Sequence, residues 1–295
     1  MSLTSDLYDI AFIGHMCFDE VISYQGVPRV APGSAVLCGA LAAVRVGKRV
    51  MVVTRMAPRD QDILEPLTAN GVTVHVIPSK ETTYMKVVHP SADVDERQIL
   101  QVRNAGMFSL AAMPEIPARR VHLAGITDQE FSLDFIAGLK QRGYRLSLDM
   151  QSFVRQVQPD HGSIAFLDVP KKQEIVRLLD TVKLDIVEAK VLTGTDDLEK
   201  AAVEIETWGC SEVVVTQAEG VLARAQGKTS YEKFSNRSVV GRTGRGDTTF
   251  AAYLARRLDH NVTDSMKFAA ALVSIKMETP GPFNGTLDQV LARMQ

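Results

Sequence analysis

Short apolar runs alternate with amphipathic stretches along almost the whole chain. The apolar runs are typical of buried strands and span residues 9–14, 50–54, 120–125, 145–149, 184–187 and 212–216. The stretches between them have the apolar spacing of helices and span residues 35–47, 61–71, 131–142, 170–182 and 196–208. Strands that alternate with helices imply right-handed crossovers. The pattern therefore predicts an α/β fold with helices on both faces of a mainly parallel sheet.

Two segments break this alternation. Residues 17–30 have strand-like residues without a helix, and residues 73–104 contain several β-like runs in succession. Extra strands without covering helices fit a small subsidiary sheet that acts as a lid. An ordinary hairpin packed on the edge of the main sheet explains the same pattern. Because no repeat or interdomain linker interrupts the sequence, we expect one domain over residues 1–295 that contains both segments.

The composition is that of a globular protein, with 45% hydrophobic residues. The 33 Lys and Arg residues nearly balance the 35 Asp and Glu residues, and the net charge of −2 does not favour nucleic acid or an anionic membrane. The three cysteines are too few and too scattered for a disulfide framework or a zinc cluster. No apolar run reaches the roughly 18 residues that span a bilayer, and the first residues lack a secretory signal. We therefore expect a soluble cytoplasmic protein.

The stretch from residue 238 to 258 carries the most chemical information. A glycine-punctuated turn, GRTGRGD (241–247), leads into a helical pattern. Glycines just before a helix allow a tight turn and expose backbone N–H groups at its positive end, which suits an anion such as a transferred phosphoryl group. Asp247 then has two interpretations. It is either a structural N-cap or a general base that faces the anion.

The segment TGRGDTTFAAYLA resembles the C-terminal signature of the ribokinase (PfkB) family of carbohydrate kinases. Other segments resemble family landmarks in family order over nearly the whole chain: DIAFIGHMCFDEVI, VAPGSAVLCGALAAVRVGKRVMVVTRM, LSLDMQSFVR, LDIVEAKVLTG, VVVTQAEG and FAAALVSIKMETPGP. The resemblance implies a ribokinase-like, three-layer α/β/α fold with a small β lid. It also implies that ATP, with Mg²⁺, donates its γ-phosphoryl group to a hydroxyl of a sugar or polyol.

The resemblance implies roles for individual residues on the phosphate side. Asp247 would accept the proton of the acceptor hydroxyl. Backbone N–H groups around Gly244, Arg245 and Gly246 would stabilise the negative oxygens of the transferred group. Asp185 and Glu188 would lie at the Mg²⁺–phosphate end and act through metal-bound waters. The implied ATP-binding residues are Asp185, Thr216, Gln217, Gly220, Thr243 and Gly281.

On the acceptor side, the resemblance implies that Asp19 accepts hydrogen bonds from two acceptor hydroxyls. The other implied acceptor contacts are Gly33, Ser34, Cys38, Asp149, Gln151 and Arg155. Structural alternatives stay open for several of these residues. Asp19 could cap a turn, Asp149 could make a structural hydrogen bond, and Arg155 could be a surface charge. Asp185 and Glu188 could be a solvated strand end.

The chain departs from the family pattern at several positions. Gly241 replaces an aspartate that in relatives often helps to hold a monovalent cation, which argues against activation by K⁺. Arg245 replaces the usual alanine, and we hypothesise that it adds a phosphate donor. Cys38 stands where a sugar-binding asparagine is expected, so ribose would not be held in the usual way. Asp185 and Ala218 replace an asparagine and a glycine of the nucleotide side.

Two local stretches, CFD (17–19) and DMQSFVR (149–155), look more like myo-inositol kinases than ribokinases. The leading expectation is therefore a cyclic polyol acceptor, such as myo-inositol. A furanose sugar or a nucleoside is the alternative within the class, and a kinase-like regulator without turnover is the alternative outside it. Lid strands in this family often pair between subunits, which adds a homodimer through the lid to the expected partners.

Overall fold

A nine-stranded sheet forms the centre of the computed structural model, which describes residues 7–91 and 97–295. Its strands are β1 (Tyr8–Ile13), β4 (Val50–Met56), β5 (Thr73–Pro78), β8 (Ala118–Leu123), β9 (Leu146–Asp149), β12 (Thr181–Asp185), β13 (Glu212–Thr216), β14 (Gly220–Ala225) and β15 (Lys228–Lys233). They lie in the order β15-β14-β13-β12-β9-β8-β1-β4-β5. All neighbours from β13 to β5 pair in parallel, while β14 and β15 are antiparallel. The predicted parallel sheet is confirmed.

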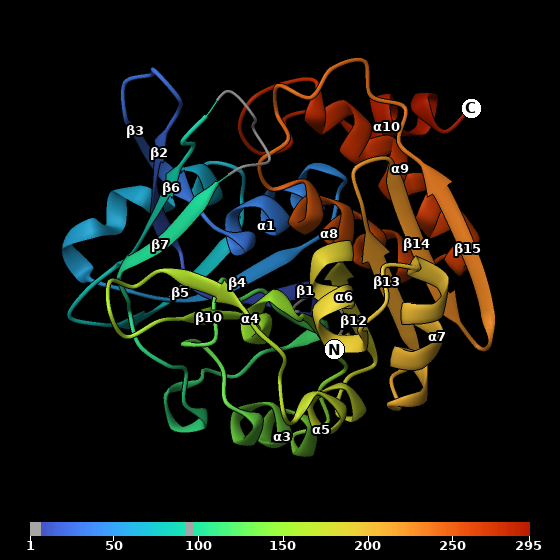
Figure 1. Ribbon diagram of the computed structural model, residues 1–295, viewed down its shortest axis with the longest axis horizontal. Helices are drawn as coiled ribbons and strands as arrows, with labels where there is room; N and C mark the ends of the chain where they lie inside the picture. The colour runs from blue at the N-terminus through green and yellow to red at the C-terminus, as the bar shows by residue number, and fades with distance from the viewer. Residues whose placement is uncertain (1–6, 92–96) are drawn as a thin grey trace, which may run out of the picture.

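Helices cover both faces of this sheet, as Figure 1 shows. The helical segments are α1 (Ala35–Arg45), η1 (Pro58–Leu64), α2 (Glu65–Thr68), η2 (Leu110–Ala112), α3 (Leu133–Gln141), α4 (Gln151–Val154), α5 (Lys172–Arg177), α6 (Ile186–Thr193), α7 (Leu198–Thr207), α8 (Arg245–Arg257), α9 (Val262–Met277) and α10 (Leu287–Arg293). Alternate residues of β1 enter two separate cores. Ile10 and Phe12 pack with α1, α8 and α9, whereas Ala11 and Ile13 pack with α3, α5, α6 and α7. The expected three-layer α/β/α arrangement is therefore confirmed.

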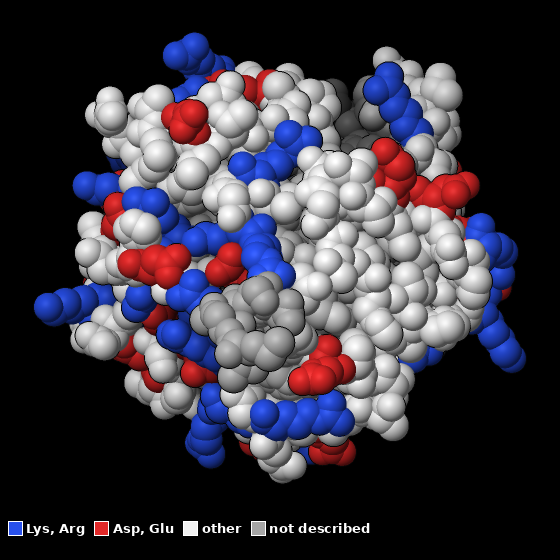
Figure 2. All heavy atoms as spheres, turned by 180° about the vertical axis from the view of Figure 1, so that it is seen from behind, with Lys and Arg blue, Asp and Glu red and all other residues white. Residues whose placement is uncertain are grey.

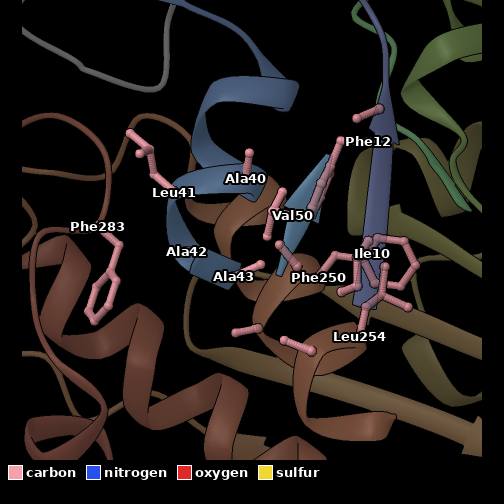
Figure 3. Close-up of a cluster of buried hydrophobic side chains, with 14 of the residues drawn as sticks. Ile10, Phe12, Ala40, Leu41, Ala42, Ala43, Val50, Phe250, Leu254 and Phe283 are labelled. Atoms are coloured by element: carbon pink, nitrogen blue, oxygen red, sulfur yellow. The ribbon is translucent and has the colours of Figure 1, made fainter. Parts of the chain in front are cut away.

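Small residues bring α1 and α8 close together above β1 and β4 (Figure 3). A Cβ atom placed on Gly39 would lie 2.7 Å from the Phe12 ring and 3.4 Å from Ala251 of α8. Close packing of this kind leaves little room for a helix to shift. The N-terminus of α8, which carries Asp247, is thus fixed by the core rather than by a loop.

A separate four-stranded sheet forms the lid, with strands in the order β3-β2-β6-β7. These strands are β2 (Cys17–Ile22), β3 (Arg29–Gly33), β6 (Thr83–Val88) and β7 (Gln98–Arg103). The expectation that residues 73–104 all belong to the lid is wrong, because β5 pairs with β4 at the edge of the central sheet. Residues 92–96 of that segment lie outside the described residues. A short hairpin of β10 (Arg155–Val157) and β11 (Ile164–Phe166) contacts the lid through a bridge between Leu100 and Ser163.

The predicted boundaries around residue 180 are also wrong. The helix expected over 170–182 is only α5, and the strand expected over 184–187 is β12, which ends at Asp185. Asp185 and Glu188 form a capping box that starts α6 at Ile186. The N-cap therefore ends the strand two residues earlier than the apolar run suggests.

Lys and Arg side chains are intermixed with Asp and Glu side chains on the face shown in Figure 2. Within the described ranges, no helix is both long enough and apolar enough to span a bilayer.

Candidate active site

Three polar residues lie at the carboxyl ends of neighbouring parallel strands. Asp149 ends β9, Asp185 ends β12 and Thr216 ends β13. Sites of open parallel sheets lie at this edge of the sheet. The N-terminus of α8 reaches the same place, because a Cβ atom on Gly246 would lie 3.9 Å from the Thr216 hydroxyl. The structure thus brings the predicted glycine turn onto the ends of the predicted strands.

The turn before α8 leaves the start of the helix open. Gly244 is the N-cap residue in the left-handed conformation, with φ of 75°, and no side chain of the described residues caps this helix. A Cβ atom on Gly244 would lie 2.5 Å from Cys38 Sγ, so both the conformation and the close approach require glycine. Asp247 sits in the first turn and is not the N-cap. The Arg245 N–H, which we expected to face the anion, instead donates to Arg242 O at 3.1 Å. The N–H groups that follow it in the first turn lie at the positive end of the helix, which suits an anion.

Asp247 lies where the lid side and the sheet side of the site meet. Its Oδ1 accepts a hydrogen bond of 3.4 Å from Gln151 Nε2, which also donates to Gly125 O at 2.8 Å. The negative charge of Asp247 helps to raise the pKa of Asp19 on the lid and of Lys183 in the sheet. A half-buried carboxylate in this position is available to a reacting hydroxyl.

Lys183 is a site residue that our sequence interpretation missed. It lies on β12, is 2% exposed, and donates to Asp149 Oδ2 at 2.7 Å. Its Nζ lies 2.9 Å from where a Cβ atom on Gly246 would stand, so it borders the anion site of α8. Burial alone would lower the pKa of Lys183, but the carboxylates of Asp149, Glu188 and Asp185 raise it. The signal in the sequence was a lysine inside an apolar strand, since a buried charge must be paired.

Asp149 therefore acts mainly as a partner within the protein. It is 1% exposed, its Oδ2 pairs with Lys183, and its Oδ1 accepts the backbone N–H of Gln151 at 3.1 Å. Of the two interpretations of Asp149, the contacts favour the structural one. By holding Lys183 and the start of α4, it positions two groups of the site.

Arg155 and Glu188 form a second charged pair beside the first. Arg155 Nη2 donates to Glu188 Oε1 at 3.2 Å, and Glu188 Oε2 accepts the backbone N–H of Asp185 at 2.8 Å. Burial and the neighbouring charge of Asp185 raise the pKa of Glu188 to about 7. Both oxygens of Glu188 accept hydrogen bonds. Within residues 7–91 and 97–295, Asp185 accepts one through Oδ1 alone, from the Glu188 N–H. Arg155 is not the simple surface charge that we considered.

On the acceptor side, Asp19 is a desolvated carboxylate on lid strand β2. Burial, partly offset by a hydrogen bond of 3.2 Å from the Cys17 thiol, raises its pKa to about 6. A Cβ atom on Gly33 would collide with the Asp19 carboxylate, so the glycine makes room for it. Gly33 thus contributes space for the Asp19 carboxylate.

Two further predicted acceptor residues lie on α1. Ser34 is the N-cap of α1, and its Oγ accepts the N–H of Leu37 at 3.0 Å. Its φ of 141° is unusual for a serine and shows that the local structure holds it in place. Cys38 lies against Gly244, and burial together with the charge of Asp247 raises its pKa to about 12. Its thiol is therefore neutral near neutral pH.

The predicted ATP-binding residues do not all lie together at the start of α8. Thr216 borders Gly246, and the carbonyl of Thr243 accepts a hydrogen bond from Lys276. Gln217 instead donates to the Tyr231 hydroxyl at 2.9 Å, and that hydroxyl lies over Gly220. Gly281 is an exposed turn residue with φ of 86°, and its conformation alone explains the glycine.

A cavity of about 400 Å³ opens beside the charged pairs. It lies between lid strand β7, hairpin strand β11 and the start of α6, and Asp185 faces it. The other lining residues are Arg97, Gln98, Ile99, Leu100, Ser163, Ile164, Phe166 and Val187. This cavity joins the lid to the phosphate side of the site.

Comparison with known proteins identifies relatives of this arrangement. The model of the pfkB family of carbohydrate kinases matches residues 4–289. A cytidine kinase of Thermococcus kodakarensis is 26% identical over 262 residues, which cover 84% of this chain and 88% of that protein.

Among solved structures, the sulfate complex of a pyrophosphate-dependent kinase of the ribokinase family is 32% identical, with a TM-score of 0.89, and the match covers 96% of this chain and 99% of that one. A pyrophosphate-dependent kinase complexed with a pyrophosphate analogue and myo-inositol is 30% identical, with a TM-score of 0.87 and the same coverage. Ribokinase of Arabidopsis thaliana, complexed with ribose and ATP, is 19% identical with a TM-score of 0.78 over 98% of this chain and 99% of that one, and shows the shared fold.

Proposed function

The chain belongs to the pfkB family of carbohydrate kinases and is a phosphotransferase; from this premise we propose that it phosphorylates a hydroxyl group of a cyclic polyol, with Asp247 as the general base. The observation that carries the proposal is the position of Asp247. It lies at the uncapped start of α8, beside the Gln151 amide and within electrostatic reach of Asp19.

In the proposed reaction, the transferred phosphoryl group lies at the N-terminus of α8. Backbone N–H groups there and the ammonium of Lys183 stabilise its negative oxygens. The acceptor hydroxyl gives its proton to an Oδ atom of Asp247 as its oxygen bonds to phosphorus. The phosphoanhydride bond breaks and its electron pair leaves with the donor's remaining phosphate. Phosphoryl transfer requires this alignment and charge stabilisation more than covalent chemistry.

The proposed acceptor site joins Asp19 to the Asp247–Gln151 pair. Asp19 accepts hydrogen bonds from acceptor hydroxyls, and its hydrogen bond from Cys17 holds the carboxylate in place. The 30% identical kinase that was solved with myo-inositol supports a cyclic polyol. A nucleoside is the second candidate acceptor, because the cytidine kinase relative is 26% identical over most of the chain.

For the donor, we propose pyrophosphate. The relatives named as pyrophosphate-dependent are 30% and 32% identical, whereas the ribokinase solved with ATP is 19% identical. Pyrophosphate has no nucleoside to bind, so its affinity must come from cations around its phosphates. Lys183 and Arg155 supply two such buried or half-buried cations. Arg245, in the first turn of α8, is proposed as a third phosphate ligand.

ATP, which the family resemblance led us to expect as the donor, is the second candidate. Val239 and Val240, immediately before the glycine turn, are 59% and 67% exposed. An exposed apolar pair beside the phosphate site suits stacking against an adenine base. Both donors share the same transferred group and the same role for Asp247.

Mg²⁺ is implied by the family for either donor. Carboxylate oxygens suit this ion, which usually keeps several waters and binds through one or two carboxylates plus substrate phosphates. Asp185 fits that role, because it faces the cavity and, among the residues that the structure describes, accepts a hydrogen bond through Oδ1 alone. Glu188 fits less well because both of its oxygens are hydrogen-bonded. Within the described ranges, no cluster of three His, Cys, Asp or Glu residues forms a metal cage. When bound, Mg²⁺ would neutralise charge on the phosphates.

The lid homodimer remains a proposal. Strand β3 lies at an edge of the lid sheet, and Val30 on it is 54% exposed. An exposed edge strand with apolar residues is a template for pairing with a second chain. Light scattering of the purified protein measures the assembly directly.

The test of the proposed function is a matrix of donors against acceptors. Pyrophosphate and ATP are each combined with myo-inositol, ribose, fructose and cytidine in the presence of Mg²⁺, and phosphomonoester formation is followed by ³¹P NMR. We expect the highest kcat/KM for pyrophosphate with myo-inositol. Higher kcat/KM with ATP would overturn the donor assignment, and preference for cytidine or a furanose would overturn the acceptor assignment.

A further inference from the structure

A second lysine that our sequence interpretation missed lies directly beneath the catalytic turn. Lys276 is in the last turn of α9 and is fully buried. Its Nζ donates hydrogen bonds to the backbone carbonyls of Gly241 and Thr243, which belong to the turn that leads into α8. Two carbonyl oxygens of one short turn therefore converge on a single buried amino group.

The same turn is attached to α9 by its backbone as well. The N–H of Gly241 donates to Met277 O at 2.9 Å. A Cβ atom on Gly241 would collide with the Thr279 carbonyl and would lie 2.7 Å from that of Lys276. No side chain fits at position 241 in this packing, so the turn cannot provide a carboxylate of its own there. Instead of a carboxylate that would hold a separate cation, the turn has the ammonium group of Lys276, which faces its carbonyl oxygens.

Lys276 is close enough to the proposed reaction centre to interact electrostatically with its charged residues. Burial lowers the pKa of Lys276 and the positive charge of the nearby Arg245 adds to that effect, whereas the negative charge of Asp247 opposes it. Both of these charged neighbours belong to the first turn of α8, at the anion site. Carbonyl oxygens that converge on one small cation are the arrangement by which backbones bind K⁺.

We propose that Lys276 is a tethered cation, which occupies the position of a monovalent ion and holds the turn from Gly241 to Gly244 in the shape that opens the N-terminus of α8. Lys276 is a positioning residue, because it touches the turn and not the reacting atoms. The inference rests on the proposed role of that turn in phosphoryl transfer. It predicts that the wild-type enzyme needs no added K⁺ or NH₄⁺.

The experiment compares two variants of Lys276 that differ in how much of the side chain's volume they leave empty. Lys276→Ala removes the charge and opens a small carbonyl-lined space, whereas Lys276→Met removes the charge and keeps that space filled. Misplacement of the turn should lower kcat about 10²-fold in both variants. NH₄⁺ and K⁺ should restore much of the loss in Lys276→Ala, with Li⁺ and choline ineffective, and should not restore Lys276→Met. Lys267→Ala, on the exposed face of the same helix, is the matched control and should behave as wild type.

A second readout does not depend on turnover. At constant ionic strength, NH₄⁺ or K⁺ should raise the melting temperature of Lys276→Ala above its value in choline chloride and leave wild type, Lys267→Ala and Lys276→Met unchanged. This measurement tests the cation site even if no donor and acceptor pair turns over, so failure of the proposed function is distinguished from failure of the inference.

Three results would overturn the tethered cation. They are a wild type that K⁺ activates severalfold, a Lys276→Ala variant with near wild-type kcat in choline buffer, and a loss of activity and stability that no cation reverses. If Lys276→Ala does not fold, the wild-type cation series and Lys276→Met decide. The proposal is supported if the kcat of the wild type does not depend on the cation and if Lys276→Met is folded but inactive. Any other combination of these results contradicts it.

Discussion

The phosphate side and the acceptor side of the site are built on different principles. On the phosphate side, buried charges are paired: Lys183 with Asp149 at 2.7 Å and Arg155 with Glu188 at 3.2 Å. On the acceptor side, burial desolvates the carboxylate of Asp19, and its hydrogen-bond donor among the described residues is the Cys17 thiol. Paired charges in the core keep a fixed geometry, which phosphoryl transfer requires.

On the acceptor side, the absence of a cation beside Asp19 among the described residues favours ligand binding. A carboxylate without a cation keeps its hydrogen-bonding capacity for the hydroxyls of a ligand. It also lies on the lid sheet rather than on the central sheet. We infer that substitutions on the phosphate side should lower kcat, and that substitutions on the acceptor side should raise the KM for the acceptor.

Among the substitutions that test the comparison of the two sides, the largest effect is expected for Lys183→Met. This change leaves the Asp149 carboxylate buried without its cation, and breaking such a pair costs about 3–5 kcal/mol of stability. It also removes a charge beside the anion site, which should lower kcat about 10²–10³-fold. Thermal unfolding and steady-state kinetics measure both effects. Lys190→Met, which removes a lysine from a largely exposed pair with Asp196, is the control and should change little.

Because Lys183→Met risks unfolding, the double variant Lys183→Met/Asp149→Leu gives a second route. Replacing both charges with apolar groups should restore much of the stability without restoring kcat. A double variant that regains turnover would show that the pair is structural and would remove the distinction between the two sides.

Asp19→Asn should have the next largest effect. Hydrogen bonds to a charged group contribute about 1.5–3 kcal/mol, so the KM for the acceptor should rise about 10-fold to 100-fold while kcat changes far less. The neighbouring Glu20→Gln is the matched control, because Glu20 pairs with Tyr84 and Lys86 within the lid. A fall in kcat with an unchanged KM would place Asp19 on the chemical step and contradict the comparison.

Gly33→Ala should give a smaller rise in acceptor KM. The new methyl group would displace the Asp19 carboxylate without removing it. Combined with Asp19→Ala, the glycine substitution should add almost nothing, since residues in contact are not additive. A double-mutant cycle on KM measures this coupling, and fully additive effects would mean that Gly33 acts independently of Asp19.

The smallest effect is expected from pH. The folded state holds the Asp19 proton more tightly than the unfolded chain, because burial raises the pKa from 3.8 to about 6. This contribution to stability is therefore present at low pH and is lost as the pH rises from about 4 to about 6. Asp19→Asn should melt at a higher temperature than wild type above pH 6, and the difference should vanish below pH 4.

Binding should show the opposite pH dependence, since only the charged carboxylate accepts two hydroxyls. The acceptor KM of wild type should rise below pH 6, and that of Asp19→Asn should stay flat. The titratable groups that face Asp19 are the Cys17 and Cys38 thiols and Asp247. A wild-type stability that increases between pH 4 and 6 relative to Asp19→Asn would contradict the desolvated carboxylate.

Much of the fold could be predicted because the alternation of strands and helices is local. The parallel strands β1, β4, β8 and β13 were predicted, and so were the helices α1, α3, α7 and α8. The helix expected over 61–71 was wrong, because that stretch is the end of η1 and the four-residue α2. We did not predict that β5 belongs to the central sheet, because an alternation of apolar residues does not say which sheet a strand joins. Antiparallel β14 and β15 were missed, and β15 (Lys228–Lys233) is polar and offers no apolar run to detect.

The candidate site was predictable where motifs are contiguous. The turn around Gly244 and Asp247 is one segment, and the structure places it at the sheet edge as expected. Lys183 and Lys276 could not be placed, because their roles depend on contacts across 34 and 35 residues of sequence. The nucleotide contacts implied for Gln217 and Gly281 stay predictions: Gln217 donates to the Tyr231 hydroxyl, and Gly281 lies in a turn with positive φ.

The central claim is that Asp247 takes the proton of the acceptor hydroxyl, and Asp247→Asn tests it most directly. The amide keeps the shape of the side chain but is not a base. With the donor and acceptor pair that wild type uses best, kcat should fall about 10²–10⁴-fold while the acceptor Kd from calorimetry stays within a few-fold of wild type. A variant that binds the acceptor and retains wild-type kcat would contradict the assignment of the base and the account of the site that depends on it.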